Sequence, residues 1–264
     1  MNIRENLGTI DESGKTEYAD PYVLIFKTKN NTNLVYFGAN HSTDMNDPQY
    51  PILKELWNKF IERKQPQNCV VLVSGGIYRP IDISDEEAIK KDAEAGLITK
   101  WAHDNGVELI SPEPNMKEVC DELEKKYTRD EIEYYFFARV VAQWHRFQQK
   151  PDFESYITRF LAMDKEDTGW TDYDFTFEHM KEIHKHLFNK EFDLSDENLF
   201  KELSDPYADK TVINSVGHEE NLIRDESIVK SILECAKDSK NIFIVYGSAH
   251  AIVQEEYLKK TLAS

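Results

Sequence analysis

One four-residue pattern, a glycine followed three residues later by a histidine, occurs twice in the chain, each time just after an apolar stretch. Gly38–His41 follows Leu34–Phe37, and Gly247–His250 follows Ile242–Tyr246. With 10 glycines and 8 histidines in 264 residues, chance alone would produce roughly 0.3 such patterns. Glycine lets the backbone turn sharply and approach a ligand, and the imidazole beyond it can bind a metal or act as a general base. The alternative is that each glycine simply ends a strand and that each histidine caps the following helix or makes a hydrogen bond to a loop.

Two glutamates are suitably placed to accompany these imidazoles, since a divalent ion or an activated water also needs negative charge. Glu94 lies in the sequence Asp-Ala-Glu-Ala-Gly, and Glu113 follows an apolar stretch in Ser-Pro-Glu-Pro. A glutamate in a helical pattern is usually a solvated surface residue. The small neighbours Ala93, Ala95 and Gly96 favour instead a tightly packed and constrained turn.

Two arginines could hold a carboxylate or stabilise an oxyanion. Arg224 precedes the last apolar stretch, and Arg139 lies in an apolar, aromatic segment where a cation is costly unless it is paired. A purely structural ion pair is the alternative for Arg139.

The elements that must position these residues are short apolar stretches of β-branched and aromatic residues, which predict core strands. The Asn-rich segment between the first two favours an antiparallel hairpin. The alternation of strands and helices over 34–111 predicts a largely parallel inner sheet, which binds ligands beyond the carboxyl ends of its strands. The predicted strands are Tyr22–Phe26, Leu34–Phe37, Val70–Val73, Val107–Ile110 and Ile242–Tyr246.

Helical spacing of apolar residues dominates the rest of the chain. We therefore expect an α/β fold with a mixed, largely parallel sheet flanked by helices and one large helical insertion. The expected single domain, 1–264, forms its sheet from 21–115 and 239–262 and is mainly helical over 116–238. The predicted helices are Pro51–Arg63, Asp85–His103, Thr128–Gln149, Phe153–Met163, Phe175–Asn189, Glu219–Lys237 and Ile252–Leu262.

The bulk composition excludes several classes of protein. A formal net charge of −17 repels phosphate backbones and anionic membrane surfaces, so we expect neither a nucleic-acid nor a membrane partner. No apolar run approaches the ~20 residues needed to span a bilayer, and the start lacks the order of a signal peptide. The three cysteines are far apart and odd in number, which favours reduced thiols. Together these features predict a cytoplasmic protein.

The two GxxH patterns, the acidic DAEAG segment, the Arg-Asp pair of a late helix and the closing strand together resemble the superfamily that contains TraB/PrgY, Tiki, erythromycin-esterase-like and ChaN-like proteins. The resemblance covers roughly residues 21–262. It implies metal-dependent peptide hydrolysis (Tiki), lactone hydrolysis with a histidine-activated water (the esterases) or haem binding (ChaN). Relatives commonly have a glutamate at the end of the third strand, where this chain has Ser74.

We expect a hydrolase that cleaves an ester, lactone or peptide bond of a small-molecule or peptide substrate. In this hypothesis His41, His250 and Glu94 position a divalent ion (Mn, Co or Zn) or an attacking water, and Arg224 stabilises the developing charge. The alternative is a non-catalytic protein that binds haem or another small molecule, which the loss of the acid at Ser74 favours. An aromatic partner interface is a third hypothesis, and homo-oligomerisation is left open. Substrate contacts are assigned to Ser74, Arg79, Glu113, Arg139 and Ser248.

Overall fold

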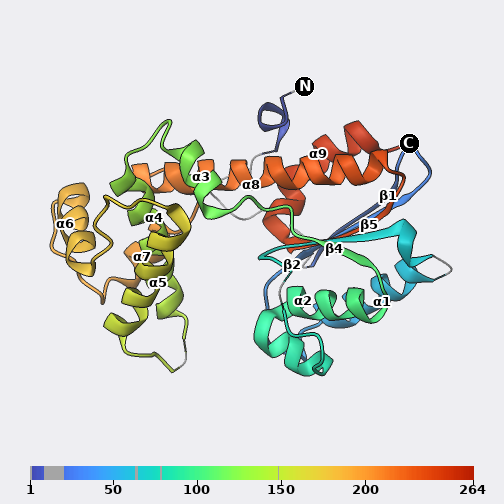
Figure 1. Ribbon diagram of the computed structural model, residues 1–264, viewed down its shortest axis with the longest axis horizontal. Helices are drawn as coiled ribbons and strands as arrows, with labels where there is room; N and C mark the ends of the chain where they lie inside the picture. Colours follow the sequence, from blue (N-terminus) through green and yellow to red (C-terminus); the bar gives the residue numbers. More distant parts are fainter. Residues whose placement is uncertain (1, 9–20, 63–64, 78, 148) are drawn as a thin grey trace. The chain divides into compact units, whose positions relative to one another are not determined.

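The computed structural model describes residues 2–8, 21–62, 65–77, 79–147 and 149–264 (Figure 1). The predicted α/β class is confirmed. The end of the predicted helix Pro51–Arg63 lies outside the described residues. The strands are β1 (Tyr22–Lys27), β2 (Asn33–Ala39), β3 (Cys69–Val73), β4 (Glu108–Ile110) and β5 (Asn241–Gly247). The helices are α1 (Gln49–Ile61), α2 (Asp85–Asp104), α3 (Met116–Leu123), α4 (Arg129–His145), α5 (Phe153–Thr168), α6 (Phe177–Phe188), α7 (Glu197–Leu203), α8 (Val212–Lys237) and α9 (Ser248–Leu262), with 3₁₀ turns at Arg4–Asn6 and Pro66–Asn68.

The chain divides into two compact units. The sheet unit comprises residues 1–113 and 225–264, and the helical unit comprises residues 114–224. The helical unit coincides with most of the predicted insertion, 116–238. The difference lies in α8, because its second half, from Asp225 onward, belongs to the sheet unit.

The sheet has the strand order β1-β2-β5-β3-β4. β1 pairs with β2 as the predicted antiparallel hairpin, and the other neighbours are parallel. The last strand of the chain, β5, therefore lies between β2 and β3. This position makes the strands that precede the two GxxH patterns direct neighbours.

Alternate residues of each central strand pack into two separate cores, as the period of two in a strand requires. On one face, Phe37, Val71 and Phe243 pack against α1 and α2. On the other face, Tyr36 and Ile244 pack against α9 and the second half of α8. The sheet is thus covered on both sides, with α1 and α2 below it and α9 above it in Figure 1.

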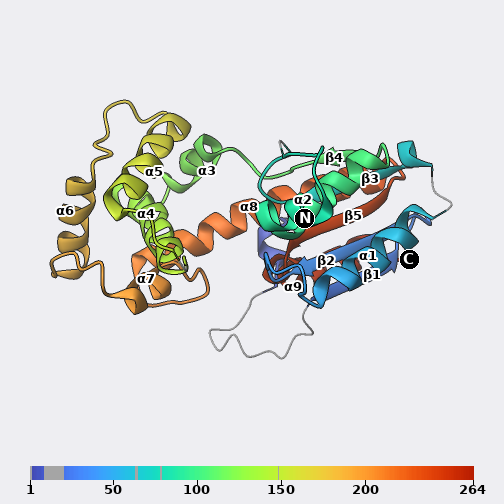
Figure 2. The same cartoon turned by 90° about the horizontal axis from the view of Figure 1, so that it is seen from below.

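The chain leaves the two central strands toward opposite faces of the sheet. After β2 it enters α1 on one face, whereas after β5 it enters α9 on the other. Where neighbouring parallel strands connect to opposite faces, a crevice forms beyond their carboxyl ends. Figure 2 looks at the sheet from the side of α1 and α2 and shows β2 beside β5.

The helical unit has a core of its own. The buried side chains Tyr134, Tyr135 and Phe137 of α4 lie at its centre, and they pack with residues of every other helix of the unit. Most aromatic residues of this segment are therefore part of this core or packed against it. The aromatic partner interface stays a prediction. Three helices begin with capping boxes, formed by Ser84 with Glu87, Asn115 with Glu118 and Thr128 with Glu131. Within the described residues, no helix has both the length and the apolar character needed to cross a bilayer.

Candidate functional site

The two GxxH patterns pack directly against each other at the carboxyl ends of β2 and β5. In the parallel register, Ala39 of β2 is opposite Gly247 of β5. A Cβ atom on Gly247 would lie 2.8 Å from His41 Nε2, and one on Gly38 would lie 2.9 Å from the Cα of Ser248. A larger side chain at Gly38 would meet backbone atoms of the other segment, and one at Gly247 would displace the imidazole of His41. The glycines of the pattern are thus explained by close approach at a shared edge of the sheet.

His41 is held by a buried carboxylate. Its Nδ1 lies 2.5 Å from Glu94 Oε1, and the exposed fractions of the two side chains are 60% and 1%. A carboxylate oxygen that accepts this hydrogen bond requires the proton on Nδ1 and leaves the lone pair on Nε2. His41 has a positive φ of 54°, a conformation that histidine adopts more readily than most residues. The basic nitrogen therefore faces Gly247 at the start of α9.

A break in helix α2 brings Glu94 to this position. Asp92 (φ −140°, ψ 28°) and Ala93 (φ 48°, ψ −137°) both leave the helical conformation, and the helix resumes after them. For a residue with a Cβ, the conformation of Ala93 costs of the order of 1–3 kcal/mol. The small residues around Glu94 predicted a constrained turn, and the structure has one there. The kink turns what would be a helix-surface glutamate into a buried partner of His41.

His250 has a separate carboxylate partner. It lies in the first turn of α9, and its Nδ1 is 2.8 Å from Asp225 Oδ1. The same oxygen accepts a hydrogen bond from Gln254 Nε2 at 2.6 Å, and the ring of Tyr246 meets the imidazole edge-on. Asp225 and Gln254 are buried. The orientation of His250 is therefore fixed from two sides.

The segments after β3 and β4 lie at the same edge of the sheet. Arg79 donates hydrogen bonds to the backbone carbonyls of Ser74, at 2.6 Å, and of Gly76. Glu113 accepts one from the backbone N–H of Gly75 at 2.8 Å. Burial lowers the pKa of the Arg79 guanidinium, and the nearby carboxylates of Asp92, Glu113 and Glu94 oppose that shift. Arg79 thus supplies positive charge close to the buried carboxylate of Glu94.

This chain has no significant match among the protein-family models, the curated proteins or the solved structures. The superfamily resemblance therefore stays a prediction, and the site is interpreted from its own geometry.

Two of the predicted site residues lie in the other unit of the chain. The guanidinium groups of Arg139 and Arg224 lie 3.6 Å and 3.7 Å from the same carboxylate oxygen, Glu220 Oε1. Arg139 also lies over the ring of Tyr135. These contacts agree with the structural alternative for Arg139. For Arg224, a role toward the histidines stays a prediction.

The three residues predicted to bind a metal do not form a three-ligand set. His41 and Glu94 are hydrogen-bonded to each other, and His250 is bonded to Asp225. Within the described part of the chain, no group of three His, Cys, Asp or Glu side chains is arranged to hold an ion. The haem alternative likewise has no contact here that favours it, so both cofactors stay predictions.

Sequence reasoning did not assign roles to the residues that orient the second imidazole. In the sequence Asp225 stands out only as the neighbour of Arg224, and Gln254 belongs to no motif. Asp225 is 25 residues before its partner His250. Asp225 lies in α8 and His250 in α9, with β5 between the two helices. The sequence separation of two such residues does not predict their contact, because it depends on how the helices pack. One available signal is that each residue shares a helix face with apolar residues, since Ile228 and Val229 follow Asp225, and Tyr257 and Leu258 follow Gln254, at spacings of three and four.

Proposed function

We propose that this protein is a hydrolase that attacks an ester, lactone or amide carbonyl with a water activated by His41. The contact between His41 Nδ1 and the buried Glu94 is the observation that carries the proposal. A carboxylate in this position fixes the tautomer of the imidazole and stabilises the imidazolium that forms during catalysis. The pair thus has the two parts of a general base, a proton acceptor and the group that orients it.

In the proposed reaction, Nε2 of His41 removes a proton from water as the water oxygen attacks the carbonyl carbon. Negative charge develops on the carbonyl oxygen, and the start of α9 is suited to receive it. The N-cap of α9 is Gly247, which makes no side-chain capping hydrogen bond, and the N–H groups of a first helical turn favour an anion. Collapse of the tetrahedral intermediate then expels the alcohol or amine.

His250 is suited to protonate the leaving group. It lies one turn into α9, whose N-cap Gly247 is the residue that His41 Nε2 faces, and Asp225 and Gln254 fix its orientation. The departing oxygen or nitrogen would take a proton from the protonated form of His250. His41 would then release to solvent the proton that it took from water, and His250 would take up a proton from solvent, which restores both imidazoles. No metal ion enters this scheme.

Hydrolysis by the purified protein tests the proposal. We expect turnover in a panel of a p-nitrophenyl ester, an alkyl ester, a lactone and a fluorogenic peptide, with kcat/KM lowered about 100-fold or more by His41→Ala. His103→Ala is the matched control, because His103 is an exposed histidine of the same unit and lies outside the cluster. A panel without turnover above that of His41→Ala would reject the proposal.

The metal version of the hypothesis has its own test. Metal analysis of the wild type, His41→Ala and His250→Ala would show a metal that disappears in the variants if the imidazoles bind it. Under the water-activation mechanism, turnover survives exhaustive chelation. Restoring an acid with Ser74→Glu then asks whether the carboxylate that relatives have at that strand end raises the rate further.

A further inference from the structure

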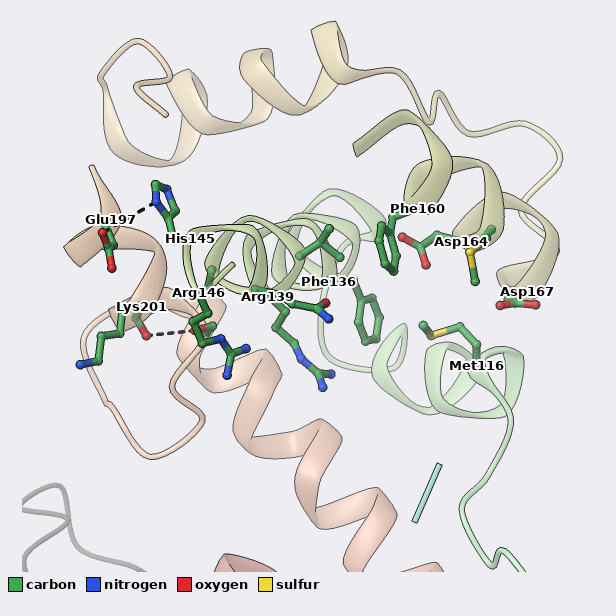
Figure 3. A pocket seen from close by; sticks show the side chains of 15 residues that line it. Met116, Phe136, Arg139, His145, Arg146, Phe160, Asp164, Asp167, Glu197 and Lys201 are labelled. Carbon is green, nitrogen blue, oxygen red and sulfur yellow. Dashed lines mark hydrogen bonds and ion pairs between the residues drawn. The ribbon is translucent and has the colours of Figure 1, made fainter. Parts of the chain in front are cut away.

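The helical unit contains a cavity that the proposed hydrolase does not use. Its volume is about 730 Å³, within the range of small-molecule pockets in proteins, which is roughly 300–1,000 Å³. Figure 3 shows the side chains that line it; they come from α3, α4, α5, α7 and the residues directly after α4 and α7. All of them belong to the helical unit. The cavity therefore needs no contribution from the sheet unit.

One part of the wall is apolar. The rings of Phe136 and Phe160 lie side by side in Figure 3, with Met116 close to them. Val140 and Met163 also line the cavity, and Met163 is one of the few exposed large apolar side chains of the described residues. Apolar side chains that line a hollow gain free energy when a ligand covers them. This region is suited to an aromatic or aliphatic body.

A second part of the wall is basic. Arg139 and Arg146 extend next to each other, and Lys201 comes from α7 on the same side (Figure 3). Arg139 is paired with Glu220, whereas no carboxylate of the described residues lies within 4 Å of the charged groups of Arg146 and Lys201. One lining carboxylate, Glu197, lies at this end of the cavity beside His145. The three cations outnumber it, and in a chain with a net charge of −17 such a local excess of positive charge favours an anionic ligand.

A buried imidazole adds an unsatisfied polar group to the wall. The side chain of His145 is 6% exposed, and neither ring nitrogen has a hydrogen-bond partner among the described residues. The nearest carboxylate, Glu197, is 3.8 Å from Nδ1, which is an ion-pair distance only if the ring is protonated. An unpaired buried donor or acceptor is destabilising, because the group has lost its hydrogen bonds to water without replacement. A polar group of a ligand in the cavity could remove that cost.

Acidic side chains at the opposite end of the cavity would determine which way round an anionic ligand binds. Asp164 and Asp167 line the cavity near Phe160, on the side away from Arg146 and Lys201 (Figure 3). They disfavour an anion at that end. We propose that the helical unit binds a small amphipathic anion, whose carboxylate, phosphate or sulfonate lies by Arg146 and Lys201 and whose apolar body lies against Phe136 and Phe160.

Fluorescence titration with 8-anilinonaphthalene-1-sulfonate, an aromatic sulfonate that brightens in apolar surroundings, tests the proposal on the full chain. We expect saturable binding that Arg146→Gln/Lys201→Gln weakens about tenfold. Lys165→Gln/Lys190→Gln is the control, since it removes the same charge from exposed lysines of this unit outside the cavity. Equal affinity in the two double variants would overturn the proposal.

Competition identifies the chemistry of the ligand. Dodecanoate or dodecyl phosphate should displace the dye, and the better competitor distinguishes a carboxylate from a phosphate ligand; dodecyltrimethylammonium should not displace it. Equal displacement by the cation would reject an anion site. Val140→Phe, which fills the cavity, should also reduce binding while the melting temperature stays close to that of the wild type. His41→Ala should leave dye binding unchanged, so failure of the hydrolase proposal and failure of this one are distinguishable.

Discussion

At the scale of single residues, the contact between His41 and Glu94 is accompanied by unusual backbone conformations on both sides. His41 has φ 54°, and Ala93, directly before Glu94, has φ 48° with ψ −137°. Strain of this kind persists only where the surrounding structure enforces it, and it is concentrated at functional sites. The backbone conformations of His41 and Ala93 therefore support a functional role for the pair of His41 and Glu94.

Glu94→Gln should abolish most of the activity without unfolding the protein. The amide has nearly the same shape as the carboxylate, but it no longer stabilises the imidazolium and can select the wrong tautomer of His41. We expect kcat to fall about 10³- to 10⁴-fold while KM changes little, as in other carboxylate–histidine pairs. Steady-state kinetics with circular dichroism as a folding control would check this. A loss below tenfold would leave Glu94 a purely structural role.

Asp225→Asn tests the role of His250 as an acid. Loss of proton donation matters most when the leaving group is a poor one, because p-nitrophenolate departs without protonation. The variant should therefore hydrolyse an alkyl ester or lactone at least about tenfold more slowly and the p-nitrophenyl ester almost normally. Equal losses on both substrates would assign His250 to positioning or stability. Comparison of the two rate ratios with those of His250→Ala provides the internal control.

At the scale of elements, helix α2 is the part in which local and tertiary preferences conflict. Ala93→Gly should raise the free energy of unfolding by about 1 kcal/mol, since glycine adopts this conformation without the Cβ penalty. The matched control is Ala95→Gly, two residues on in the resumed helix, which should lower the stability by about 1 kcal/mol. Urea denaturation measures both. Destabilisation by Ala93→Gly would show that the kink is not strained.

Most elements could be predicted from the sequence because each carries its own local signal. The strand predicted at Ile242–Tyr246 spans Asn241–Gly247 as β5. The helix predicted from Asp85 begins there, after a Ser84 whose capping box with Glu87 is a pattern visible in the sequence. What the sequence could not give is the order of the strands, since the position of β5 between β2 and β3 is set by long-range pairing. The same limit applies to Asp225, whose partner His250 comes from another helix.

Only the part of the candidate site that carries local sequence signals could be predicted. The glycines and histidines of the two patterns are local signals, and the structure brings both patterns to one edge of the sheet. The small residues on both sides of Glu94 are also a local signal, since they predict the constrained turn that contains it. Arg224 and Arg139 were predicted by type alone, and their shared partner Glu220 is visible only once α4 and α8 pack together. Local sequence therefore indicates which residues can do chemistry, and packing decides which of them meet.

At the scale of the whole molecule, the excess of acidic groups is not confined to the surface. In the helical unit the carboxyl group of Glu133 is completely buried, and neither of its oxygens has a hydrogen-bond partner among the described residues. Burial and the neighbouring Asp164 hold the pKa of Glu133 well above its usual range. Burial likewise raises the pKa of Asp164 from 3.8 to about 6. The helical unit thus carries two carboxyl groups whose protonated form is favoured by burial, compared with exposed carboxyl groups.

These raised pKa values give the stability of the helical unit a defined pH dependence. A folded state that binds protons more tightly than the unfolded chain gains stability below the unfolded pKa and loses it as the pH rises through the folded value. For Asp164 the loss falls between about pH 4 and pH 6. Asp164→Asn should remove this loss and stabilise the unit at pH 7 by about 1–3 kcal/mol.

Hydrogen exchange followed by mass spectrometry can measure this effect in each unit, by comparing peptides of α4 with peptides of β5. We expect protection of α4 in the wild type to decrease from pH 4 to pH 6 after correction for intrinsic exchange, and Asp164→Asn to flatten that dependence. Asp209→Asn is the control, because Asp209 is an exposed carboxylate of the same unit that does not contribute to the raised pKa of Asp164. An equal response of the two variants would mean that general charge repulsion in this acidic chain, and not the burial of Asp164, controls the stability of the unit.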